Sequence, residues 1–319
     1  MLKSKQRKIK RLLSLNNKLQ FDNCFQESVE ILEEVKKLDP QDSDLYFYLG
    51  RAYSELGQMD KAIDNYIKST ECTPVNRVNN QGGAFHNLGL IYVNQNRITE
   101  AIPCFKKAIE LSPGIPYTYC NLGQIYNDSD RYQEAIPLFK KAIKIYPKDG
   151  IFFVELGVSY YALGQYDEAL IHWKKAFELS PNDSDVYLRI GTCYFQFEKY
   201  ADAQILWEKS IELNPKNKHA YFNLGLLHLE FEQYESAIVH FKMSIKLESR
   251  VARSYFNLGE AYARYGRFED SIVHLRKYID LDPYNSDGYH RLATIYQKIG
   301  RDKDAEECFE KKKQFETDG

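Results

Sequence analysis

The sequence lacks the cysteine patterns that mark redox, metal or disulfide chemistry. It contains six cysteines, but none forms a CxxC pair and none keeps a fixed spacing to a histidine. Six cysteines in 319 residues are too few for a small secreted domain held together by disulfides. We therefore expect reduced, mostly buried thiols, with no bound metal ion and no cofactor.

Long apolar runs are also missing. No segment offers the roughly 18 uninterrupted apolar residues of a membrane-spanning helix, and the opening residues MLKSKQRKIKRLL lack the apolar stretch and cleavage site of a signal peptide. We expect a cytoplasmic, unprocessed chain without membrane insertion. The basic run at the start is an alternative site for nucleic acid or an anionic membrane, but it has no interleaved aromatic residues, which favours a solvated start of a helix.

The charge is close to balanced, and no linker divides the chain. A formal net charge of −2, with 28% charged and 44% hydrophobic residues, excludes a disordered chain and argues against general nucleic-acid binding. A chain of 319 residues exceeds one ordinary compact domain, yet no segment rich in Pro, Gly and Ser separates two. A repeat array resolves this conflict.

Known catalytic motifs are absent as well. The sequence has no GxxxxGK[ST], GxGxxG, HExxH or GxSxG motif. Its seven histidines are scattered, and His228 replaces a tyrosine of the repeat described below, so we expect it in the core. Asp-rich turns such as PQDSD and PNDSD lack the spacing of a calcium loop and fit helix N-caps instead. We expect that this chain is not an enzyme.

What the sequence does contain is a repeat of 34 residues. Glycine returns at this interval, and each copy stands in a Leu-Gly or Ile-Gly pair followed three residues later by an aromatic residue or His. The evenly spaced positions are Gly89, Gly123, Gly157, Gly191, Gly225 and Gly259. Such a period is typical of solenoids, in which each unit buries its apolar faces against its neighbours.

One unit can be interpreted as a pair of helices. Tyr119, Leu122 and Tyr126 are spaced by three and four residues, which places them on one stripe of a first helix. Ala135 and Phe139 form a similar stripe on a second helix, after a polar turn at 127–130. The small residues allow the two backbones to approach, and the rings fill the space around that contact.

These residues resemble the tetratricopeptide repeat family, whose signature is W-x2-L-G-x2-Y, then A-x3-F, then P. The resemblance implies an all-α, right-handed superhelical solenoid of antiparallel helix pairs across residues 1–319 as one array. Eight units cover 43–315, and 1–42 form a degenerate N-terminal hairpin with Asn16 at the glycine position. The resemblance also implies a concave groove, lined by the first helix of each pair, that receives a peptide or a partner protein.

Two irregularities interrupt the pattern. Gly50 and Gly89 are 39 residues apart, which predicts a loop enlarged by about five residues near 75–82. Pro103 and Pro137 fall early in second helices, where each removes a backbone hydrogen bond and is expected to bend the helix locally.

Candidate groove residues follow from their distance to the repeat glycine. The site two residues before it carries asparagine in four repeats: Asn87, Asn121, Asn223 and Asn257. This row resembles the asparagine ladder of tetratricopeptide superhelices that hold extended peptides by their main chain, because an amide both donates and accepts. The alternative is that these amides bond locally between adjacent repeats.

Apolar and basic residues complete the candidate site. An apolar floor is expected from Val154, Val158, Phe195, Phe222 and Leu226, unless neighbouring helices bury it. Toward the C-terminus Arg253 and Arg291 suit an acidic peptide or a terminal carboxylate, although a solvated charged face is the alternative. The flanking residues depart from the carboxylate clamp of chaperone-binding tetratricopeptide domains.

Together these features predict a non-enzymatic scaffold or adaptor that binds a segment or helix of a partner protein in its concave groove. Two alternatives remain open. One is a self-associating structural protein, that is, a homo-oligomer whose end repeats stack. The other is a substrate-reading subunit of a separate enzyme.

Overall fold

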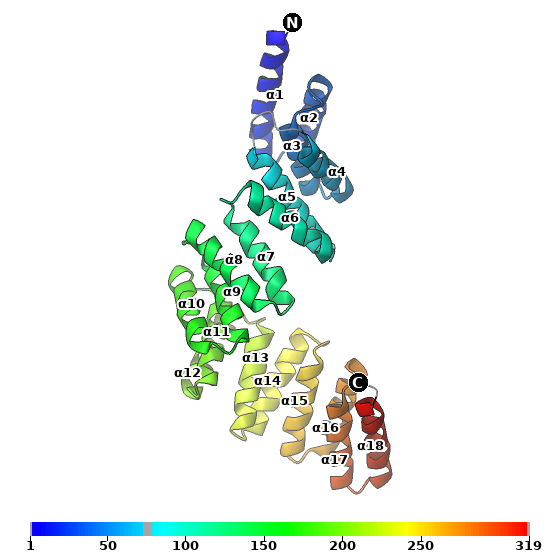
Figure 1. The fold of residues 1–319 in the computed structure, drawn as a ribbon. Helices are drawn as coiled ribbons and strands as arrows, with labels where there is room; N and C mark the ends of the chain where they lie inside the picture. The colour runs from blue at the N-terminus through cyan, green and yellow to red at the C-terminus, as the bar shows by residue number, and fades with distance from the viewer. Residues whose placement is uncertain (1, 73–77, 318–319) are drawn as a thin grey trace. The chain divides into compact units, whose positions relative to one another are not determined.

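The computed structural model describes residues 2–72 and 78–317, and these fold into α-helices that pair along the chain (Figure 1). The described residues contain no strand. They fall into two compact units, 1–165 and 166–319. The fold class predicted from the sequence, an all-α solenoid of helix pairs, is confirmed.

The N-terminal unit contains nine helices, in which each helix from α2 to α9 packs against the one before it. Their bounds are α1 Leu2–Phe21, α2 Phe25–Leu38, α3 Ser43–Glu55, α4 Met59–Glu71, α5 Val78–Asn94, α6 Ile98–Leu111, α7 Pro116–Asp128, α8 Tyr132–Ile145 and α9 Gly150–Ala162.

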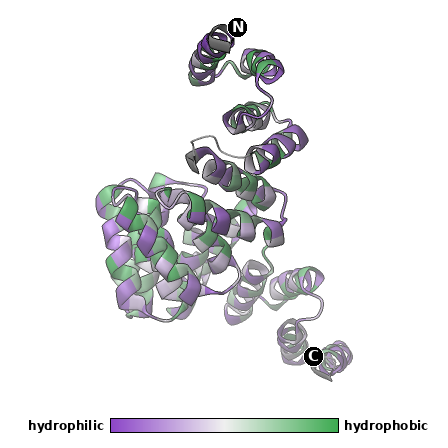
Figure 2. Ribbon diagram, turned by 45° about the horizontal axis from the view of Figure 1, so that its top comes forward, coloured by the Kyte–Doolittle hydropathy of each residue, from purple (hydrophilic) through white to green (hydrophobic). Residues whose placement is uncertain are grey.

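The C-terminal unit also contains nine helices, which follow one another in the same way. Their bounds are α10 Tyr166–Leu179, α11 Ser184–Gln196, α12 Tyr200–Leu213, α13 Lys218–Glu230, α14 Tyr234–Leu247, α15 Ala252–Arg264, α16 Phe268–Leu281, α17 Ser286–Lys298 and α18 Asp302–Thr317. Hydrophobic and hydrophilic residues alternate around the helices of both units, as amphipathic helices in a stack require (Figure 2).

The repeat glycines fit against the second helix of their own pair. A Cβ atom built on Gly123 would lie 2.7 Å from the ring of Phe139, and one on Gly225 would lie 2.6 Å from the ring of Phe241. Both rings are fully buried. The glycine is therefore a steric requirement of the close contact between helices, as the alternation of small and large residues predicts.

The first helices begin where the sequence predicts caps. The side chain of Asp42 accepts a hydrogen bond from the amide of Asp44 at 2.9 Å, and Asp183 accepts one from Asp185 at 2.9 Å. Asn285 does the same for α17. Each bond satisfies a backbone amide that has no partner within the helix, so these acidic and amide-rich turns are structural.

The degenerate N-terminal pair replaces the tight glycine contact by hydrogen bonds. Asn16 occupies the glycine position and is fully buried, and the hydroxyl of Ser28 donates to its Oδ1 at 2.6 Å. Gln20 Nε2 donates to Ser28 Oγ at 3.1 Å and to the carbonyl of Tyr48 at 3.2 Å. A polar network therefore joins α1, α2 and α3 where other repeats use apolar packing.

The predicted enlarged loop near 75–82 differs from the structure in its described part. Residues 75–77 lie outside the described residues, while 78–82 belong to α5. The inserted residues thus extend a first helix at its N-terminus, so that α5 has 17 residues where α3 has 13. Pro103 and Pro137 lie inside α6 and α8, as predicted.

Within each pair, the turn rests on one residue in the left-handed backbone region. Among the described residues, positive φ angles occur at Asn23, Gly57, Asn96, Asp130, Gly164, Glu198, Glu232, Gly266 and Gly300. At Gly266 the amide bonds the Ala263 carbonyl and the next amide bonds the Tyr262 carbonyl, which is a Schellman motif. These positions recur every 34 residues, apart from the five-residue insertion.

We expect Gly266→Ala to lower the free energy of unfolding by about 1 kcal/mol, because a Cβ in the left-handed region meets the carbonyl oxygen that follows. Glu232→Gly, at a non-glycine residue with φ of 57°, should have the opposite sign or no effect. Urea unfolding of both variants checks this expectation. A stabilising Gly266→Ala would contradict the backbone argument, since a Cβ there meets no atom within 4 Å.

Candidate functional site

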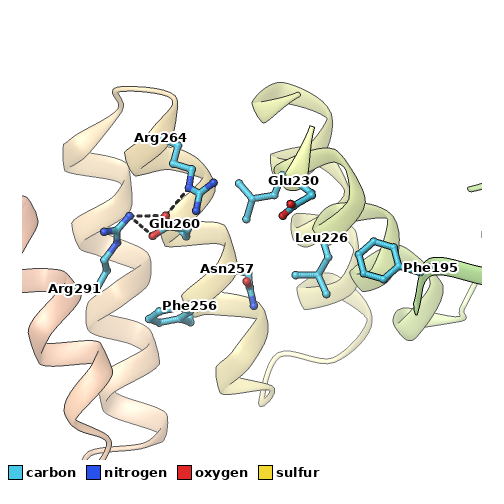
Figure 3. A pocket seen from close by; sticks show the side chains of 9 residues that line it. Phe195, Leu226, Glu230, Phe256, Asn257, Glu260, Arg264 and Arg291 are labelled. Atoms are coloured by element: carbon cyan, nitrogen blue, oxygen red, sulfur yellow. Dashed lines mark hydrogen bonds and ion pairs between the residues drawn. The ribbon is translucent and has the colours of Figure 1, made fainter. Parts of the chain in front are cut away.

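A pocket lies on the first helices of the C-terminal unit. Its volume is about 500 Å³, and it is lined by four of the first helices, α11, α13, α15 and α17. The lining residues are Phe195, Leu226, Leu229, Glu230, Phe256, Asn257, Glu260, Arg264 and Arg291 (Figure 3). We call this cavity the α13–α15 pocket.

The apolar part of the pocket comes from four side chains. Phe195 stands on α11 and packs against the rings of Tyr200 and Trp207, with centroid distances of 5.3 and 5.7 Å. Leu226 and Leu229 stand one turn apart on α13, and Phe256 on α15 contacts Tyr278. Packing against buried rings fixes the orientation of both phenylalanines, so this surface is preformed.

The polar part is organised around Glu260. Its side chain is 11% exposed and accepts a hydrogen bond from Arg264 Nε at 2.7 Å. Arg291, which reaches across from α17, forms an ion pair with the same carboxylate (Figure 3). The hydrogen bond to Glu260 raises the pKa of Arg264. One carboxylate thus holds two guanidinium groups on adjacent first helices.

Asn257 lies between the two parts of the pocket (Figure 3). Its Nδ2 donates to the Arg253 carbonyl at 2.9 Å, one turn earlier in α15. The Oδ1 atom makes no hydrogen bond to any described residue. This amide therefore offers an acceptor to a group entering the pocket.

The other predicted residues of the C-terminal unit lie outside the pocket lining. The guanidinium of Arg253 sits over the ring of Phe222 at 5.2 Å. Asn223 Nδ2 donates to Thr192 Oγ1 at 3.3 Å, which is a bond between adjacent repeats. Of the predicted site residues, the pocket thus collects Phe195, Leu226, Asn257 and Arg291.

The predicted residues of the N-terminal unit have separate environments. Asn87 Nδ2 donates to the hydroxyl of Tyr66 at 3.0 Å, which is again a local bond between repeats. Asn121 is half-buried and has no hydrogen-bond partner in the described part of the chain. Val154 is buried and Val158 is half-buried. The asparagine row therefore divides into amides that bond within the chain and amides with free capacity.

Sequence reasoning missed three residues of the pocket: Glu230, Phe256 and Glu260. Glu260 directly follows the repeat glycine, at the position that Leu226 takes in the preceding repeat. That position is assigned to the groove by the same spacing, so a charged residue there was a signal for Glu260. Phe256 repeats the position of Phe222 in the preceding unit.

Reactive side chains are not gathered in this site. Burial raises the pKa of Cys120 and of Cys193 to about 12, which keeps both thiols protonated near neutral pH. Over residues 2–72 and 78–317, no group of three or more His, Cys, Asp and Glu side chains is arranged to hold a metal ion. No helix within those ranges is long and apolar enough to span a membrane.

Histidines pack between rings in the C-terminal unit. His240 stacks on His228 with a centroid distance of 5.0 Å, and His274 stacks on Tyr262 at 5.4 Å. Burial lowers the pKa of His240 and of His274 below 6.5. His228 itself is half-buried and bonds Gln233, so the expectation of a fully buried core histidine is wrong.

These histidines predict a loss of stability in mild acid. Because their pKa is lower in the folded than in the unfolded chain, the unfolded chain binds more protons below about pH 6.5. Stability is then complete above that pH and falls as the pH drops toward the folded-state values. We expect the urea midpoint of the C-terminal unit to decrease between pH 7.5 and pH 5.5, and His240→Phe to reduce the decrease. An unchanged slope in His240→Phe would exclude His240 as a contributor.

Family models place the fold in a known group. Tetratricopeptide repeat models match residues 33–64, 81–148, 126–172, 184–217, 206–239, 252–285 and 274–307, and a further model described as TPR repeat matches 157–198. No curated protein matches the chain significantly in sequence.

Solved structures with the same fold include three of low identity. The APC/C hetero-tetramer Cut9–Hcn1 is 18% identical over 92% of this chain and 57% of that chain, with a TM-score of 0.62. The C-terminal part of a TPR repeat-containing protein from Cytophaga hutchinsonii is 19% identical over 77% of this chain and 98% of that chain, with a TM-score of 0.57. MamA from Desulfovibrio magneticus RS-1 is 24% identical over 53% of this chain and 96% of that chain, with a TM-score of 0.49.

At these identities the solved structures speak for the fold alone. The family itself follows from the repeat models, whose matches run from residue 33 to residue 307 with short gaps. The chain belongs to the tetratricopeptide repeat family.

Proposed function

We propose that this chain is a non-enzymatic interaction scaffold that binds a peptide segment or helix of a partner protein along its first helices. The α13–α15 pocket is the observation that carries the proposal. It combines a preformed apolar surface with a few oriented polar groups, which is the usual composition of a recognition site. Side chains arranged for bond-breaking chemistry do not accompany it among the described residues.

The pocket suits an apolar side chain of the partner. Phe195, Leu226, Leu229 and Phe256 provide the walls, and desolvating an aliphatic or aromatic anchor there contributes about 1.5–3 kcal/mol. The backbone amide next to that anchor can donate to Asn257 Oδ1. This placement would fix the register of the bound segment.

Charge selects among possible anchors. Glu260 is already neutralised by Arg264 and Arg291, and the remaining guanidinium N–H groups point to the pocket margin together with Glu230. An acidic group beside the anchor can bind Arg264, which is about half exposed, without displacing Glu260. We therefore expect a preferred segment that carries an acidic residue next to an apolar one.

The test is a selection of displayed random 12-residue peptides on the full chain, followed by fluorescence polarisation with the peptides enriched. Leu226→Arg places a long charged side chain across the pocket and should weaken the enriched peptides by at least about tenfold, the equivalent of about 1.4 kcal/mol.

Leu15→Arg is the matched control, because it makes the same change on α1 at a leucine that is 44% exposed. It should leave peptide affinity unchanged. If both variants bind like the unmodified chain, or if no peptide is enriched, the pocket is not the binding site.

A further inference from the structure

A row of exposed aliphatic residues marks the second helices of the C-terminal unit. Ile171, Ile205, Val239 and Val273 stand on α10, α12, α14 and α16 and are 65%, 62%, 58% and 63% exposed. They are 34 residues apart, so they occupy the same position in four successive repeats. We call them the outer row.

The outer row is distinct from the α13–α15 pocket. The pocket is formed by first helices, whereas the row lies on second helices, opposite the buried residues Ala169, Trp173 and Ala176 in the case of α10. In the N-terminal unit the same position holds Pro103 and Pro137. Single exposed aliphatic residues are ordinary, but four in register form a continuous strip.

Charged residues border the strip on both sides. One turn before the row, the four helices carry only acidic charges: Asp167, Glu168, Asp202, Glu235, Glu269 and Asp270. One turn after it they carry six basic residues and one acid: Lys174, Lys175, Lys209, Lys242, Arg276, Lys277 and Glu208. This order follows the helix dipole, which favours acids near the N-terminus and bases near the C-terminus.

The surface is therefore complementary to itself. A half-turn about the line of the row lays apolar residues on apolar residues and sets the acidic band of one copy against the basic band of the other. A uniformly charged partner would be repelled by one band, whereas a second copy of this chain carries both bands at the matching repeat spacing.

We propose that two copies of this chain associate through the outer row in an isologous dimer. A standard interface buries about 800 Å² on each partner, which exceeds the surface of four side chains. The aliphatic stems of the flanking lysines must therefore be buried as well, and the dimer forms at micromolar rather than nanomolar concentration.

Sedimentation velocity of the full chain between about 1 and about 200 μM tests the dimer at the concentrations where a small interface is populated. The average mass should rise toward that of two chains, and Ile205→Asp with Val239→Asp should abolish the rise. Phe21→Asp, a change at an 86% exposed ring on α1, is the control and should dimerise normally. A chain that stays monomeric throughout, or a dimer that survives the double substitution, overturns the proposal.

Charge reversal tests the geometry. On α12, Asp202 of one copy faces Lys209 of the other, so Asp202→Lys and Lys209→Asp should each raise the dimer dissociation constant by about tenfold or more. The double variant restores opposite charges and should recover most of the affinity. If it dimerises no better than the single variants, the half-turn arrangement is wrong.

Discussion

Gly225→Leu is expected to lower the free energy of unfolding by about 3 kcal/mol or more, the largest effect of any single change considered for the core. A Cβ on Gly225 would already lie 2.6, 2.7 and 3.0 Å from three ring atoms of Phe241. The ring is fully buried and held between α13 and its neighbours, so it has no free space to enter. The isobutyl group must therefore push α13 and α14 apart.

Chemical unfolding followed by circular dichroism measures this loss. Because repeat arrays unfold in parts, hydrogen exchange should also show faster exchange in α13 and α14 than in α3. Gly114→Leu is the control, since a Cβ on Gly114 meets no atom within 4 Å and the residue lies between helices. Comparable losses in the two variants would mean that the effect comes from the side chain added and not from the helix contact.

The last pair shows that the glycine can be replaced only with a change in its partner. Ala293 takes the glycine position on α17 and is fully buried, while its counterpart Phe309 on α18 remains partly exposed. In the internal pairs the counterpart ring of Phe139 or Phe241 is fully buried. A terminal helix has a free outer side, so α18 can accommodate the extra methyl group of alanine.

The pair architecture could be predicted from the sequence because its determinants are local and repeat. Gly123, Leu122 and Tyr126 recur in each unit at the same spacing, and the structure buries all three as the helical period requires. The turn residues were harder to foresee. Glu198 and Glu232 adopt the left-handed conformation because the hairpin imposes it, although glutamate has no intrinsic preference for it.

The candidate site could be predicted only in part. Spacing from the repeat glycine assigned Leu226, Asn257 and Arg291 to one face, and the pocket brings them together. Spacing could not show that Asn87 and Asn223 spend an amide N–H on Tyr66 and Thr192, because those partners lie 21 and 31 residues away in sequence. The difference between a free and an occupied amide depends on tertiary packing.

Glu260→Ala should cost about 2–4 kcal/mol of stability and also change the pocket. Removing one member of a buried ion pair leaves its partners without compensation, which typically costs about 3–5 kcal/mol. Here Arg264 and Arg291 are 48% and 32% exposed, so water would recover part of that loss. Arg291 Nε is already buried without a partner in the described residues, which makes Arg291 the group most affected.

Glu260→Gln separates charge from shape. Glutamine retains an oxygen that can accept from Arg264, so its cost in a urea titration should be smaller than that of alanine. Arg291→Met in the Glu260→Ala background provides the double-mutant comparison, because it removes the uncompensated guanidinium while it keeps a long side chain. We expect the double variant to be more stable than Glu260→Ala alone. If it is less stable by the full cost of a second independent change, Glu260 does not act through Arg291, and the ion pair joining α15 to α17 contributes little to holding the pocket together.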